Sequence, residues 1–131
     1  MEQHEQLIAR AVAAYREVSA TRVECASPGG LVSLLLEELI DCLDGLRGAI
    51  MAGQGARRDG VRRRGESILF SLEASLNGEA GILTDRLTRI YGQVRQLMAS
   101  AVAGNDPERC IQARDLVEPI AEAWRAIAQT A

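Results

Sequence analysis

Apolar residues recur at steps of three and four along most of the chain, which is the spacing of amphipathic helices. This pattern predicts helical segments at residues 5–19, 28–52, 61–76, 82–103 and 107–128. No stretch shows the alternation typical of a half-buried strand. Because short loops join the four long segments, each should be the antiparallel neighbour of the next. We therefore expect an all-α protein: an up-down four-helix bundle over residues 28–128, with an N-terminal helical segment at residues 1–20 that is mobile or folded back on the bundle.

Each long segment has one apolar face that should point into the bundle. On the second and third segments the expected inward residues are Val32, Leu36, Leu39, Leu43, Leu46, Ile50, Val61, Ile68, Leu69, Leu72 and Leu76. On the fourth and fifth they are Leu83, Leu87, Ile90, Val94, Leu97, Ala101, Cys110, Ala113, Val117, Ile120, Trp124 and Ile127. More apolar residues remain on the second and fourth segments: Leu31, Leu34, Leu35, Ile40, Ile82, Tyr91, Met98 and Val102. Helices that are apolar nearly all round must be covered on several sides, by their own chain or by a partner's helix.

Local signals mark where helices should begin and break. Ser27 and Asp106 are favourable N-caps, and the proline that follows each of them suits the first helical position. The run "GQGARRDG" at residues 53–60 predicts a loop. Gly45 and Gly48 lie inside a predicted helix, where glycine costs up to about 1 kcal/mol relative to alanine. Either another segment approaches the second helix closely there, or the bundle tolerates the cost.

Composition narrows the class of protein. The chain is 47% apolar with 3% aromatic residues, which favours a helical core of Leu, Ile, Val and Ala. The net charge of −3 does not suggest a nucleic-acid partner. The three cysteines lack metal-ligand spacing and fit reduced, buried thiols. Since there is no secretion signal and no apolar run of membrane-spanning length, we expect a soluble, cytoplasmic bacterial protein.

The sequence contains few of the side-chain patterns that enzymes use for catalysis. The chain contains one histidine, His4, near its start. Glu-x-x-His pairs of a di-iron bundle, a dinucleotide loop and a phosphate-binding loop are all missing from the sequence. We therefore expect neither an enzyme nor a metal or organic cofactor.

Five arginines lie close together at residues 57–64, in "RRDGVRRR". Cations near a helix start oppose the helix dipole, so other groups should offset them. Carboxylates on the preceding helix are the expected partners: Glu37, Glu38, Asp41 and Asp44. The sharper alternative is an RNA-binding regulatory bundle that uses the cluster from Arg57 to Arg64.

A set of short motifs, in order over residues 7–124, resembles one known family. They are "AAYREVSA", "CASPGGLVSLLLEELIDCL", "SLN", "RLTRIYGQV", the pair Asn105-Asp106 and "EAW". No single motif is specific, but the ordered set is similar to FliS, the flagellar export chaperone family. This resemblance implies a helical bundle without enzymatic activity. It also implies a protein that holds the disordered C-terminal region of flagellin, prevents its premature polymerisation, and docks at the flagellar type III export gate.

Site residues follow from the resemblance together with the surplus apolar side chains. We expect a flagellin groove lined or supported by Leu31, Leu35, Leu36, Leu39, Tyr91 and Val94. The family pattern implies that Val12, Tyr15 and Val18 dock at the gate or cover the groove. Without cargo, an uncovered groove could also lead to a homodimer.

The sequence departs from the family pattern in places that affect cargo fit. Leu36, Glu37 and Glu38 stand where the family has an aromatic residue followed by Asp-Gly, and Pro119 replaces a helix former. A kink at Pro119 is expected, because proline removes one helical hydrogen bond. These departures leave open a related adaptor that serves another export substrate.

Overall fold

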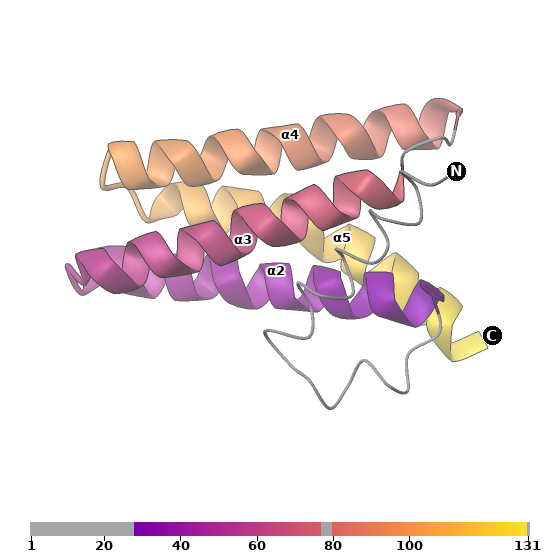
Figure 1. Cartoon of the computed structure of the whole chain (residues 1–131), viewed down its shortest axis with the longest axis horizontal. Helices are drawn as coiled ribbons and strands as arrows, with labels where there is room; N and C mark the ends of the chain where they lie inside the picture. Colours follow the sequence, from indigo (N-terminus) through magenta and orange to yellow (C-terminus); the bar gives the residue numbers. More distant parts are fainter. Residues whose placement is uncertain (1–27, 77–79, 131) are drawn as a thin grey trace.

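The computed structural model describes the backbone of residues 28–76 and 80–130, and the side chains of residues 29–76 and 80–127. It contains four helices: α2 (Pro28–Met51), α3 (Gly55–Ser75), α4 (Ile82–Ala103) and α5 (Glu108–Thr130). The chain runs up and down through them, and α2 lies beside both α3 and α5 while α4 lies beside the same two (Figure 1). The predicted all-α four-helix bundle is confirmed. The predicted N-terminal segment lies outside the described residues.

The start of α3 is the main error in the predicted helix boundaries. The run predicted as a loop at residues 53–60 is helical from Gly55, so the whole arginine cluster lies on α3. The link from α2 is short because Gly53 has a φ of +67° and ends α2 in a Schellman motif. In this motif the Gln54 N–H bonds the Ala49 carbonyl at 2.9 Å, and the Gly53 N–H bonds the Ile50 carbonyl at 3.2 Å.

The turn between α4 and α5 behaves as its sequence predicts. The side chain of Asp106 accepts a hydrogen bond of 3.1 Å from the Glu108 N–H, as an N-cap residue does. Asn105, with a φ of 50°, lies at the end of α4, where the Asp106 N–H bonds the Ala101 carbonyl. Asparagine tolerates this left-handed conformation better than most residues. Pro119 lies inside α5, on its exposed side.

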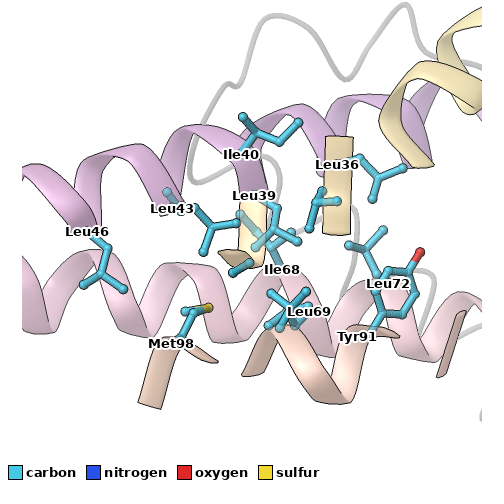
Figure 2. Packing of buried hydrophobic residues seen from close by; sticks show 14 of the residues in the cluster. Leu36, Leu39, Ile40, Leu43, Leu46, Ile68, Leu69, Leu72, Tyr91 and Met98 are labelled. Carbon is cyan, nitrogen blue, oxygen red and sulfur yellow. The ribbon is translucent and has the colours of Figure 1, made fainter. Parts of the chain in front are cut away.

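The core is aliphatic and continuous through the bundle. Leucines and isoleucines of α2 and α3 meet each other and two residues of α4, Tyr91 and Met98 (Figure 2). On α2 the predicted inward face is confirmed, from half-buried Val32 to Ile50. The buried residues of α4 are Leu87, Tyr91, Val94, Met98 and Ala101.

Two predicted inward residues are exposed instead. Leu83 of α4 is 71% exposed and Ile127 of α5 is 56% exposed. Conversely, four residues expected to be surplus belong to the core: Leu35, Ile40, Tyr91 and Met98. Helical spacing gives the direction of a side chain around its helix, but not how far the neighbouring helices extend beside it.

Candidate functional site

The residues predicted to line a groove come together in the structure, but inside the bundle. Five of them are between 0% and 2% exposed: Leu35, Leu36, Leu39, Tyr91 and Val94. Leu31, near the start of α2, is half-buried. In this conformation the five enclosed side chains have no surface to offer a partner, and they support the bundle surface from beneath. Val12, Tyr15 and Val18 lie outside the described residues.

Apolar side chains that reach the surface gather at one end of the bundle. Ile82 and Leu83, in the first turn of α4, are 75% and 71% exposed. At this end α2 begins, α3 ends, α4 begins and α5 ends (Figure 1). Three half-buried side chains and exposed Ile127 belong to the helix termini that meet here. We call this set the apolar end: Leu31, Leu76, Ile82, Leu83, Trp124 and Ile127.

Two contacts hold the corner where α2 and α5 meet beside the apolar end. A Cβ placed on Gly29 would lie 3.7 Å from Cζ3 of Trp124, so the indole lies against the first turn of α2. Arg125 donates a hydrogen bond to Glu37 across the same pair of helices, at 3.1 Å. Packing and an ion pair therefore hold the start of α2 and the end of α5 together beside the apolar end.

Large apolar side chains elsewhere are exposed singly. Met51, in the last turn of α2, is 63% exposed at the opposite end of the bundle. Phe70 is 47% exposed on the outer side of α3. Single exposed apolar residues are normal on proteins, whereas large contiguous apolar patches mark interaction surfaces. The apolar end is thus the candidate partner-binding surface of the described chain.

The predicted neutralisation of the arginine cluster by α2 is wrong for two of the four carboxylates. Glu37 pairs with Arg125 at 3.1 Å, and Asp44 pairs with Arg114 at 3.2 Å. Both arginines belong to α5. The carboxylates of α2 lie between two neighbouring helices, and the sequence alone does not indicate which neighbour they face.

The buried titratable groups are placed as core residues and not as reactive ones. Burial raises the pKa of the Cys42 thiol to about 12, although the nearby positive charge of Arg64 acts to lower it. Burial also raises the pKa of the Cys110 thiol to about 11 and that of the Tyr91 phenol to about 12. Thiols held neutral are poor nucleophiles and poor metal ligands.

Metal-binding groups do not cluster in the described part of the chain. Within residues 28–76 and 80–130, no three side chains of His, Cys, Asp or Glu are grouped so that they could hold an ion. In the same ranges, each helix is too short or too polar to cross a bilayer.

Comparison with known proteins identifies the family. Residues 11–131 match the protein family described as "Flagellar protein FliS". The chain belongs to this family. No curated protein and no solved structure matches it. FliS proteins are flagellar export chaperones, so the resemblance carried by the ordered motifs is confirmed at the level of the family.

The candidate surface of this FliS protein was only partly visible in its sequence. Ile82 was among the apolar residues left over after the predicted core was filled. Leu83 was assigned to the core, because it shares a helical face with Leu87 and Val94. The position of Leu83 in the first turn of α4 was the one sign that its side chain could be exposed, since the first turn of a helix often extends beyond the neighbouring helices.

Proposed function

We propose that this protein is a cytosolic chaperone that binds the disordered C-terminal region of flagellin. It prevents premature polymerisation of flagellin and delivers it to the flagellar type III export gate. It acts by binding alone, without catalysis or a cofactor. The observation that carries the proposal is the match of residues 11–131 to the FliS family.

Exposed side chains at the apolar end support the proposal physically. Complete burial of Ile82 or Leu83 by a client would contribute about 1.5–3 kcal/mol each. A disordered client loses conformational freedom when it folds on its partner, at a cost of about 2–5 kcal/mol or more. The client must therefore cover a broad apolar surface, which adds half-buried Leu31, Leu76 and Trp124 to the two exposed residues.

The sequence-predicted groove residues have two different roles in this proposal. Leu31 contacts the client directly, because part of its side chain is accessible. Leu35, Leu36, Leu39, Tyr91 and Val94 act from beneath, holding α2 and α4 in the spacing that the client recognises.

The N-terminal segment contributes the second activity of the proposed chaperone. Val12, Tyr15 and Val18 dock at the export gate or cover the client surface when no client is bound. Deletion of residues 1–20 should therefore change gate docking, client affinity or both. If both stay the same, the segment has neither role.

Isothermal titration calorimetry with the C-terminal segment of flagellin tests the proposed function. Binding should release heat, show a negative heat-capacity change and raise the helical content of the mixture above that of its parts. Flagellin that lacks its C-terminal segment is the matched control and should not bind. Absence of binding by intact flagellin, with the chaperone folded, would refute the proposal.

A further inference from the structure

The first ten residues of α3 carry five arginines, two of which are held in ion pairs within residues 28–76 and 80–130. Residues 55–66 hold five arginines against two carboxylates, Asp59 and Glu66. Each carboxylate pairs inside α3: Arg58 with Asp59 at 3.0 Å, and Arg62 with Glu66 at 3.0 Å. We call this region the basic surface: Arg57, Arg58, Arg62, Arg63 and Arg64.

Three of these arginines have no carboxylate partner among the described residues. Arg57 donates a hydrogen bond to the neutral side chain of Gln54, at 3.0 Å. Arg63 and Arg64 are exposed, and neither is held in an ion pair within residues 28–76 and 80–130. The two α2 carboxylates Glu37 and Asp44 are used by arginines of α5 instead.

The local backbone adds to the positive potential. The side chain of the N-cap residue Gln54 accepts no hydrogen bond from the backbone N–H groups that open α3, and the first turn of the helix contains no acidic residue. The positive end of the helix dipole therefore lies beside Arg57 and Arg58, where cations raise the free energy of the folded chain. An anionic partner would relieve this repulsion as well as pair with the exposed guanidinium groups.

We propose that the basic surface docks an acidic segment of a second protein. The proposal does not depend on which client occupies the apolar end. Along α3 the nearest residues of the two surfaces, Arg64 and Leu76, are about 18 Å apart at 1.5 Å per residue, so both surfaces can be occupied at the same time. One end of the bundle then carries the client, and the other end receives an acidic protein partner.

Features of α3 favour an acidic protein segment over a nucleic acid. Single-stranded nucleic acids are held by a basic track combined with aromatic side chains on which bases stack. The exposed aromatic residue of α3 is Phe70, and Glu66 and Glu73 lie one turn away on either side of it, on the same helical face. Each carboxylate is paired with an arginine, Glu66 with Arg62 and Glu73 with Arg95, so the ring is flanked by ion pairs and not by unpaired cations that would hold a phosphate backbone beside it. The net charge of −3 likewise disfavours a long polyanion, whereas a short acidic segment contacts the basic surface alone.

Nuclear magnetic resonance titration with a poly-glutamate peptide tests the proposal on the full chain. Backbone amide signals of residues 55–66 should shift first, and the shifts should weaken as salt is added. The variant Arg63→Glu/Arg64→Glu should bind the peptide about tenfold more weakly, since each exposed ion pair is worth up to about 1 kcal/mol. Both positions are exposed, so the variant keeps the packing of the core.

A matched control has the same change in charge at a different place. Arg86→Glu/Arg89→Glu reverses two exposed arginines in the N-terminal half of α4, toward the other end of the bundle. This variant should bind poly-glutamate within about twofold of the wild type, because rim charges distant from a contact are screened. Equal losses in both variants, or shifts that do not centre on residues 55–66, would overturn the proposal. Tighter binding of poly-uridine RNA than of poly-glutamate, with the same dependence on Arg63 and Arg64, would also overturn it in favour of a nucleic-acid partner.

Discussion

The side chain of Met98 in α4 fills the space above Gly65 in α3. A Cβ placed on Gly65 would lie 2.7 Å from Cε of Met98, closer than nonbonded carbon atoms approach. Both residues are buried, and Cβ of Cys42 in α2 lies 3.7 Å from the same point. Gly65 is therefore a position at which α2, α3 and α4 meet with no room for a further side-chain atom.

Replacement of Gly65 by alanine should lower the free energy of unfolding by about 1 kcal/mol. Overpacking of a filled core lowers the free energy of unfolding by about 1–3 kcal/mol, whereas the better helix propensity of alanine raises it by up to about 1 kcal/mol. Urea denaturation followed by circular dichroism measures the difference. In the Met98→Leu background the loss should be smaller, because the leucine side chain ends one atom sooner.

Gly48→Ala is the matched control for this prediction. Apart from the backbone of its own helix and its two chain neighbours, nothing lies within 4 Å of a Cβ at Gly48, so alanine should raise the free energy of unfolding, by up to about 1 kcal/mol. Equal effects of the two substitutions would contradict the packing described for Gly65.

The cap of α5 makes a second prediction about stability. Asp106→Ala should lower the free energy of unfolding by about 1 kcal/mol, because the Glu108 N–H loses the acceptor it bonds at 3.1 Å. Asp106→Asn should retain most of that stability, since asparagine caps helices about as well as aspartate. If the asparagine variant is as unstable as the alanine variant, the loss comes from another interaction of Asp106, such as its ion pair with Arg109 at 3.5 Å.

Stability should fall as the pH rises above about 8. Burial raises the pKa of Cys42 from 9.0 to about 12, of Cys110 from 9.0 to about 11, and of Tyr91 from 10.0 to about 12. In the unfolded chain these groups ionise at their ordinary pKa values, while in the folded chain they stay neutral. The unfolded state therefore binds fewer protons in this pH range, and each group lowers the free energy of unfolding by up to about 1.4 kcal/mol per pH unit.

Denaturation in urea at several pH values between about 8 and 11, under reducing conditions, measures this dependence. Below about pH 8 these three groups contribute almost no slope, because they are nearly all neutral in both states. Cys42→Ala should give a shallower decline between about pH 9 and 11 than the wild type, whatever its stability at neutral pH. A decline with the same slope in both proteins would show that the Cys42 thiol is not held neutral by the fold.

The helices and most of the core could be predicted from the sequence because their signals are local. Steps of three and four gave the inward face of α2, and Asp106-Pro107 gave the start of α5. The start of α3 was predicted six residues too late, at Val61 and not at Gly55. Glycines at 53, 55 and 60 suggested a loop, but a single left-handed residue, Gly53, is enough to end α2.

The candidate site was harder to predict because it depends on where helices end relative to one another. Tyr91 and Met98 were expected to be left over, yet they complete the core opposite α3. Leu83 lies on the buried face of α4 but in its first turn, where its side chain is 71% exposed. The partners of Glu37 and Asp44 could not be assigned for a similar reason, because α2 has a neighbour on each side.

If a client binds to the apolar side chains that this bundle leaves exposed, then charges placed on those side chains should weaken its binding. Calorimetry should measure binding of the C-terminal flagellin segment to the wild type and to the double variant Ile82→Asp/Leu83→Asp. The control is Met51→Asp, which places one charge on an exposed apolar position at the opposite end of the bundle. Our account predicts that the double variant binds at least about tenfold more weakly while its helical content stays unchanged, and that the Met51 variant binds like the wild type. Wild-type affinity of the folded double variant for flagellin would contradict it.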